Sequence, residues 1–253
     1  MTYLKGVYWD LDGTIANTEL EAHLPAFNNA FKEFGLNWYW NEHLYLDLLK
    51  INGGKNRIAH YSKITKNSLS DDLIIKIHQK KQYYYLNFIK NDFVKLKTGV
   101  LRLITELYEK EVRQFIVTSS SKCQVNSLLL NLFGKFKPFE FIISSDDVTF
   151  HKPNPLPYMK ATQLSGIKNK NAVVIEDSNA GIRSALGAGL PTIFVHSNLP
   201  TVIDDDLKLK CIIDGLGDNI IMSNVIKGPK ITKNYIDYDF LNNYLSSISH
   251  AKY

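Results

Sequence analysis

Two aspartates, Asp10 and Asp12, end the first apolar segment of the chain and are separated by a single leucine. Along an extended strand, side chains two residues apart point to the same side, and Gly13 then lets the backbone turn sharply. Two such carboxylates suit a nucleophile and a general acid, with a cation to hold their charges together. By itself, the Asp-x-Asp-Gly pattern is also typical of a turn or of a calcium loop.

Two further polar groups follow later apolar segments. In Thr118-Ser119-Ser120, a hydroxyl and successive backbone N–H groups at the start of a helix can hold a phosphoryl oxygen. Serine clusters are, however, more often loops or helix caps. Lys152, followed by Pro153, could neutralise a phosphoryl oxygen and the nucleophile. Taken alone, a solvated lysine before a helix is the simpler interpretation.

A second pair of carboxylates, Glu176 and Asp177, ends another apolar segment. Adjacent carboxylates at the end of a buried strand are costly unless they are paired or bind a metal. Magnesium prefers a few carboxylates and keeps several waters. We therefore expect Mg²⁺ as a cofactor. Its protein ligands would be Asp10, Asp177 and the backbone carbonyl of Asp12, with Glu176 in the inner or outer coordination shell.

Six short aliphatic segments without alternation predict strands that are covered on both faces, as in a parallel sheet. Helical stretches separate the earlier ones, so the predicted fold is α/β, a doubly wound, Rossmann-like parallel sheet. Ligands of such sheets bind beyond the carboxyl ends of the strands, where the polar groups above would gather. The predicted strands are 6–10, 115–119, 141–144, 172–177, 192–196 and 211–214, and the helices 101–110, 124–133 and 179–188.

The hundred or so residues between Asp12 and Phe115 contain no strand pattern. Apolar side chains at helical spacing predict helices instead, at 18–34, 41–50, 56–64 and 70–89. We predict that 18–93 is a helical cap domain inserted into a core domain made of 1–17 and 94–253. The tail beyond Gly217 yields only a short predicted helix at 240–247.

Composition excludes several classes of protein. The hydrophobic fraction is 45% and the charged fraction 22%, as in folded globular proteins. The net charge of +5 comes from scattered lysines, so we expect no nucleic-acid partner. The two cysteines are far apart, and the chain has no long apolar segment and no signal peptide. We expect a monomer that does not bind membranes and lies in the cytoplasm, or in the plastid stroma of a photosynthetic eukaryote.

The order and positions of the four polar groups resemble the four motifs of the haloacid-dehalogenase-like superfamily, up to about Gly217. The helical insertion resembles the first cap type of that family. The resemblance implies a Mg²⁺-dependent phosphatase in which Asp10 attacks phosphorus and becomes an aspartyl-phosphate. Asp12 would protonate the leaving oxygen and later take a proton from water. Ser119 and Lys152 would hold the phosphoryl oxygens, and Ser120 would contact the substrate.

The cap segment is similar to that of the CbbY-type phosphatases, which are related to the β-phosphoglucomutases and hydrolyse xylulose 1,5-bisphosphate, a by-product of Rubisco. This similarity implies a sugar phosphate as substrate. Lys55 and Arg57, after Gly53-Gly54, would bind the distal phosphate, and His23 and Tyr45 would lie nearer the sugar hydroxyls. The two glycines could equally form a plain turn between helices, and His23 could be a packing residue.

Several alternatives remain open. The motifs are shared with sugar-phosphate mutases and with phosphoglycolate-type phosphatases. A binding module would have lost a catalytic carboxylate, and none is lost here. Gly215-Leu216-Gly217 lacks the full fingerprint of a nucleotide binder.

The chain departs from its relatives at Asn17, where an acidic residue is usual, and at Leu156, where aspartate usually follows the proline.

Overall fold

The computed structural model describes residues 3–250 except 52, 92 and 198–200. The chain forms two compact units. The core unit comprises the residues up to Asn17 and those from Leu96 onward, and the helical unit comprises Thr18–Lys95.

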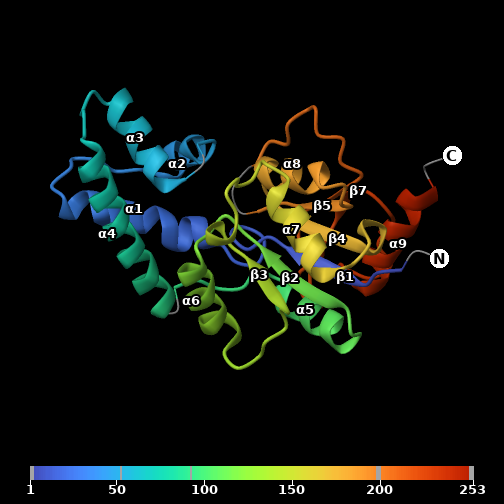
Figure 1. Ribbon diagram of the computed structural model, residues 1–253. Helices are drawn as coiled ribbons and strands as arrows, with labels where there is room; N and C mark the ends of the chain where they lie inside the picture. Colours follow the sequence, from blue (N-terminus) through green and yellow to red (C-terminus); the bar gives the residue numbers. More distant parts are fainter. Residues whose placement is uncertain (1–2, 52, 92, 198–200, 251–253) are drawn as a thin grey trace. The chain divides into compact units, whose positions relative to one another are not determined.

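The core unit is built on one sheet of seven strands among the described residues, in the order β3-β2-β1-β4-β5-β6-β7. All neighbouring strands are parallel except β6 and β7, which are antiparallel. Figure 1 shows the arrows of β1 to β4 side by side in this unit. The strands are β1 Gly6–Trp9, β2 Arg113–Val117, β3 Phe141–Ile143, β4 Ala172–Glu176, β5 Thr192–Val195, β6 Cys211–Ile213 and β7 Val225–Lys227.

Helices cover both faces of this sheet, which explains why the central strands β1 and β4 are buried along their whole length. On one face, Tyr8 of β1 belongs to an apolar cluster with Tyr158 and Ala185 of two covering helices. On the other face, Gln114 of β2 accepts a hydrogen bond from the Trp9 indole and donates to a helix carbonyl. The helices are α5 Val100–Glu109, α6 Lys122–Phe133, α7 Leu156–Ser165, α8 Asn179–Gly187 and α9 Tyr238–His250.

Strand order reverses at the centre of the sheet. The chain moves outward from β1 through β2 to β3, then crosses back to place β4 on the other side of β1. The carboxyl ends of β1 and β4 therefore lie beside each other at a topological switch point, where ligands of open α/β sheets bind. The predicted α/β fold with an all-helical insertion is confirmed.

The helical unit has its own core, which is dominated by aromatic rings. Trp40 lies at its centre, with ring centroids 4.7 Å from those of both Phe27 and Phe31. The side chain of Asn28 bonds the backbone N–H and carbonyl of Trp40, each at 2.8 Å. A π-helix at Glu19–His23 leads into α1 Leu24–Glu33, and α2 Glu42–Leu49, α3 Gly54–Ile64 and α4 Asp71–Lys90 follow.

The two segments that join the units are paired within the core unit. Ala16 and Leu96 form an antiparallel bridge, and the Lys97 N–H donates to the Ile15 carbonyl at 2.9 Å. This pairing explains why the helical unit ends at Lys95, two residues later than the cap boundary predicted from the sequence.

Three details differ from the sequence predictions. The helix predicted over 18–34 is divided into the π-helix and α1. The tail contains the short strand β7, and α9 is longer than the predicted 240–247. All six predicted strands, β1 to β6, end one or two residues before the predicted positions, so most of the polar groups lie just past them. None of the described helices is long and apolar enough to cross a membrane.

Candidate active site

The strand register brings the chemical groups of three strands to one level of the sheet. Trp9 pairs with Ile116 of β2 and with Ile175 of β4. The next residue along β1 is Asp10, whose N–H donates to the Ile175 carbonyl at 3.0 Å. Asp10 therefore lies between Val117 and Glu176, the last residues of the flanking strands.

Lys152 links these strands through its buried ammonium group. Its Nζ donates to Asp10 Oδ1 at 2.7 Å, to the Val117 carbonyl at 2.8 Å and to Glu176 Oε1 at 2.5 Å. Burial by itself lowers the pKa of Lys152, but the Asp10 and Glu176 carboxylates outweigh burial and raise it. The lysine therefore stays charged and is buried in ion pairs with both carboxylates, and its role toward a phosphoryl group stays a prediction.

Three buried carboxyl groups form the acidic part of the site. Asp10, Glu176 and Asp177 each offer an oxygen within 4.8 Å of the others. Burial, followed by the charge of Glu176, raises the pKa of Asp177 to about 7 and that of Asp10 well above its usual range. With Lys152 as their bonded cation, the ionised cluster would carry two net negative charges. A hard divalent cation such as Mg²⁺ fits this donor set, because it prefers carboxylate oxygens.

The turn after β1 passes very close to Asp177. Gly13 has a φ of +89°, and a Cβ on it would lie 2.0 Å from Asp177 Oδ2. The Thr14 hydroxyl donates to Asp177 Oδ1 at 3.3 Å. Any side chain at position 13 would both strain the backbone and displace this carboxylate. The glycine therefore allows Asp177 to lie next to the Asp10 segment.

Hydroxyl groups bond the side chain of Asp12. Its Oδ2 accepts from Ser120 Oγ at 2.6 Å and from Thr118 Oγ1 at 3.3 Å. Ser120 was predicted to contact the substrate, and in this structure its hydroxyl bonds Asp12. Ser119 lies between these two residues and is exposed, so its predicted contact with a phosphoryl oxygen stays a prediction. The predicted metal contact of Asp12 concerns its backbone carbonyl and also stays a prediction.

The residues predicted in the cap have well-defined partners within the helical unit. His23 is buried, and its Nδ1 lies 2.5 Å from Lys81 Nζ. The Tyr45 hydroxyl donates to Glu19 Oε2 at 2.5 Å, and the Arg57 guanidinium lies 5.8 Å from the centre of the Tyr45 ring. Gly53 precedes α3 with a φ of +85°, Gly54 is the first residue of α3, and Lys55 is exposed.

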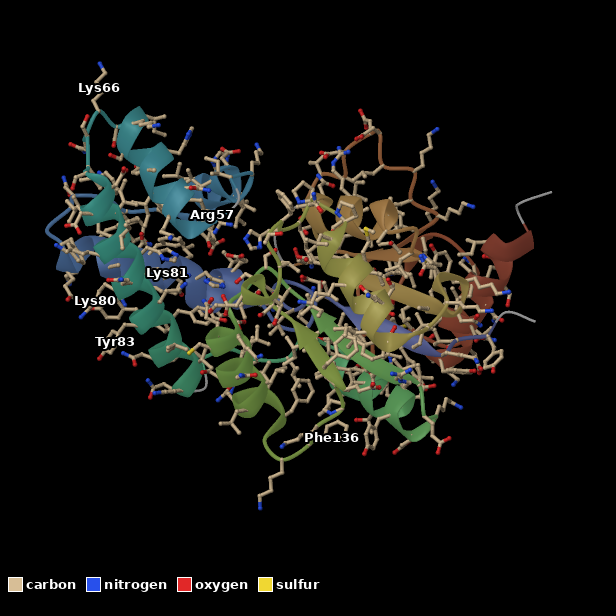
Figure 2. The ribbon with its side chains drawn as sticks, viewed as in Figure 1. Arg57, Lys66, Lys80, Lys81, Tyr83 and Phe136 are labelled. Carbon is tan, nitrogen blue, oxygen red and sulfur yellow. The ribbon has the colours of Figure 1, made fainter. Side chains whose placement is uncertain are left out.

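Sequence reasoning missed two basic residues of α4. Burial, followed by the charges of neighbouring basic groups such as Lys81 and Lys55, lowers the pKa of His78 to about 4. Lys81, which Figure 2 labels on α4 beside Lys80, is buried, and its ammonium lies 4.9 Å from the centre of the Phe27 ring of α1. A usable signal was present: position 81 continues the buried positions 74 and 77 at helical spacing, where a lysine is unexpected.

Two residues of the core unit were also missed, the buried Tyr158 and the half-buried Lys97. The Tyr158 hydroxyl donates to Glu176 Oε1 at 2.9 Å. Lys97 Nζ donates to the carbonyls of Gly13 at 2.5 Å and His196 at 3.1 Å. Burial lowers the pKa of Lys97, and the carboxylates of Asp177 and Asp10 oppose that effect. Neither residue belongs to a recognisable pattern in the sequence.

A buried cluster of carboxylates around one lysine, at the switch point of a doubly wound sheet, suits a hydrolase that transfers a phosphoryl group. The family model of haloacid dehalogenase-like hydrolases matches residues 7–195, which include all four motifs. The chain belongs to the haloacid-dehalogenase-like hydrolase family, and the predicted phosphatase of this family is confirmed.

Among its relatives, the CbbY protein of Rhodobacter capsulatus is 36% identical over 196 residues, 77% of this chain and 86% of that protein. A CBBY-like protein of Arabidopsis thaliana is 29% identical over 86% of this chain and 70% of its own length. The crystal structure of a mutant CbbY from Rhodobacter sphaeroides in complex with xylulose 1,5-bisphosphate has a TM-score of 0.77 and 30% identity. It covers 84% of this chain and 94% of that one. The predicted likeness to CbbY-type proteins is confirmed.

We expect Mg²⁺ to stabilise the protein more at pH 8 than at pH 6. The pKa of Asp177 in the folded chain is about 7, above its ordinary value of 3.8. Its contribution to the stability of the metal-free protein is therefore complete below about pH 4 and lost as the pH rises through 7. Mg²⁺ needs the ionised carboxylate, so binding strengthens over the same interval.

Thermal unfolding in MgCl₂ and in EDTA at both pH values checks this expectation. The difference in Tm between the two solutions should be larger at pH 8. In the Asp177→Asn variant, the difference should become small and lose most of its pH dependence. An equal Mg²⁺-induced shift at pH 6 and pH 8 in the parent protein would contradict the prediction.

Proposed function

We propose that this chain hydrolyses a small sugar phosphate, xylulose 1,5-bisphosphate, through an aspartyl-phosphate on Asp10, with Mg²⁺ as cofactor. The observation that carries the proposal is the geometry around Asp10. Its carboxylate is buried, hydrogen-bonded to Lys152 and adjacent to two further carboxylates, while the Asp12 carboxylate accepts a hydrogen bond from Ser120. These are the positions that a nucleophile and a separate general acid require.

In the first step, a carboxylate oxygen of Asp10 attacks the phosphorus and the bond from phosphorus to the sugar oxygen breaks. Asp12 gives its proton to that leaving oxygen. In the second step, Asp12 takes a proton from water as the water oxygen attacks the same phosphorus. The bond between phosphorus and Asp10 then breaks, and inorganic phosphate is released with Asp10 and the protonated Asp12 restored.

Lys152 and the carboxylates supply the electrostatics of both steps. Lys152 would stabilise the negative charge on the phosphoryl oxygens, with Ser119 as a hydroxyl donor to the same group. When held by Asp10, Asp177 and Glu176, Mg²⁺ would screen the carboxylates from the anionic substrate. Without such screening, two unit like charges ~4 Å apart repel by ~4 kcal/mol at an effective dielectric constant of ~20.

The substrate assignment rests on the cationic residues of the helical unit and on the relatives. We propose that Lys55 and Arg57 bind the phosphate that is not cleaved and that His23 and Tyr45 contact sugar hydroxyls. The pKa of His78 is lowered first by burial and then by four neighbouring basic groups, and this gathering of basic side chains supports an anion as the ligand of the helical unit. The crystal structure with xylulose 1,5-bisphosphate is of a relative with 30% identity.

A phosphate-release screen tests this assignment. We expect kcat/KM for xylulose 1,5-bisphosphate to exceed that for xylulose 5-phosphate or phosphoglycolate by at least about tenfold, because one additional charge-assisted contact of ~1.4 kcal/mol gives that factor. EDTA should stop the release. In each reaction, the concentrations of free phosphate and of the remaining sugar phosphate are measured.

The alternatives give different results in the same screen. A sugar-phosphate mutase would convert β-glucose 1-phosphate to an isomer without releasing phosphate. Faster cleavage of phosphoglycolate than of the bisphosphate would reject the substrate and keep the phosphatase. The expected monomer and the cytoplasmic or stromal location stay predictions, which gel filtration and cell fractionation can test.

A further inference from the structure

Tyr158 of α7 contacts the charged groups of the site from within the protein core. Its side chain is fully buried, and its hydroxyl donates to Glu176 Oε1 at 2.9 Å. The same oxygen accepts from Lys152 Nζ at 2.5 Å. The Lys152 ammonium also lies 5.1 Å from the centre of the Tyr158 ring, within the range of a cation–π contact.

The Glu176 carboxylate is oriented by donors at both of its oxygens. Its Oε2 lies 3.2 Å from the Asp177 N–H nitrogen and from Ser178 Oγ, and 3.4 Å from the Ser178 N–H nitrogen. Its Oε1 is held by Lys152 and Tyr158. A Cβ on Gly181 would lie 1.8 Å from that Oε1, so the carboxylate is packed closely against the start of α8.

We propose that Tyr158 is a positioning residue for the phosphoryl-transfer step, an inference that rests on the roles given to Lys152 and Asp10 in the proposed function. The Tyr158 hydroxyl shares the negative charge of Glu176 Oε1 with Lys152. This balance keeps the ammonium bonded to both Glu176 and Asp10. Without the hydroxyl, Oε1 attracts the ammonium more strongly, and Lys152 moves away from the position at which it meets the phosphoryl oxygens. Small displacements of a charged group in a site cost rate because the transition state requires a defined geometry.

Tyr8 provides a matched control within the same core. It is fully buried, belongs to the same apolar cluster as Tyr158, and its hydroxyl lies 2.6 Å from Ser165 Oγ. Among the described residues its hydroxyl bonds Ser165 and none of the carboxylates of the site, although Tyr8 lies only two residues before Asp10. Changing either tyrosine to phenylalanine removes one buried hydroxyl and preserves the ring.

Steady-state kinetics on Tyr158→Phe and Tyr8→Phe separate positioning from packing. We expect kcat of Tyr158→Phe to fall roughly tenfold, the effect of one hydrogen bond to a charged group, with KM changed less than about twofold. Tyr8→Phe should keep kcat within about twofold of the parent while losing a similar amount of Tm. Equal kcat values for the two variants would overturn the inference.

A second measurement does not depend on the substrate. Trifluoroberyllate, a mimic of the phosphoryl group on aspartate, is titrated into the protein in the presence of Mg²⁺, and its binding is followed by fluorine NMR. Its affinity should fall roughly tenfold in Tyr158→Phe and stay unchanged in Tyr8→Phe. Equal affinity in both variants overturns the positioning role and leaves the proposed function standing. No binding to the parent protein would remove the proposed Asp10 chemistry, and the inference with it.

Discussion

Replacement of Asp10 by asparagine is expected to abolish phosphate release while the protein stays folded. Asparagine is nearly the same size but is not a nucleophile, so no aspartyl-phosphate can form. Loss of a nucleophile commonly reduces kcat by about four orders of magnitude or more. The fold should tolerate the change because Lys152 keeps its hydrogen bonds to Glu176 and to the Val117 carbonyl.

Two measurements check this prediction. Protein-bound phosphate, trapped by acid quench from labelled substrate, should be present in the parent protein and absent in Asp10→Asn. Circular dichroism and Tm should remain close to those of the parent, since the change removes one of three mutually repelling carboxylates. Asp47→Asn, on an exposed helix surface, is the control for an aspartate change. An Asp10→Asn protein that releases phosphate at the parent rate would remove Asp10 from the mechanism.

Replacement of Lys152 by methionine should damage both activity and stability. Lys152 is the cation bonded to Asp10 and Glu176. The exposed fraction of the side chain is 10% for Asp10 and 0% for Glu176. Removing one partner of a buried ion pair typically costs about 3–5 kcal/mol of unfolding free energy, because the remaining charges are left uncompensated. We also expect kcat to fall by about 10²–10³-fold, as for the loss of a donor that stabilises transition-state charge.

A double variant separates the two effects of this change. Lys152→Met combined with Glu176→Gln removes one cation and one anion, so most of the lost stability in urea unfolding should return while kcat stays low. Mg²⁺ should also restore part of the stability of the single variant. Lys50→Met, in an exposed ion pair, should change neither quantity measurably. Full activity in Lys152→Met would exclude a role for the ammonium in catalysis.

The positions of the chemical groups were predictable because of how parallel sheets are built. Aliphatic segments that end in Asp10, Ser119 and Glu176 place their last residues at one edge of a sheet, whatever the details of packing. The register of β1 with its two neighbours then makes the convergence nearly unavoidable. Lys152 was predictable only through the motif, since a lysine outside a strand has no fixed depth.

The partners of these groups could not be predicted because they depend on packing between distant segments. The sequence around Tyr158 is typical of a helix with an aromatic residue in the core. It contains no feature that predicts a hydrogen bond between the Tyr158 hydroxyl and Glu176. Ser120 was expected to face the substrate, and its actual bond to Asp12 depends on how the chain turns after β2. In the helical unit, Lys81 interrupts a stripe of buried apolar residues on α4, and this signal is present in the sequence.

The secondary-structure predictions were wrong where the spacing of apolar residues does not define a single type of helix or strand. The apolar spacing over 18–34 does not reveal the π-helix at Glu19–His23, because a single π-turn spans too few residues to show a period of its own. Strand β7 has only three residues, two of them exposed, so it lacks a recognisable pattern. Its existence depends on pairing with β6.

The bridge between Ala16 and Leu96 affects how a chain of this kind can change during evolution. Because the two ends of the helical insertion are fastened to each other inside the core unit, the core can form whichever segment of chain connects them. The insertion is thus free to vary, or to be exchanged for another, with little effect on the carboxylates and lysine that carry out the reaction. New substrates could then be acquired through residues 18–95 while the inherited chemistry remains in place.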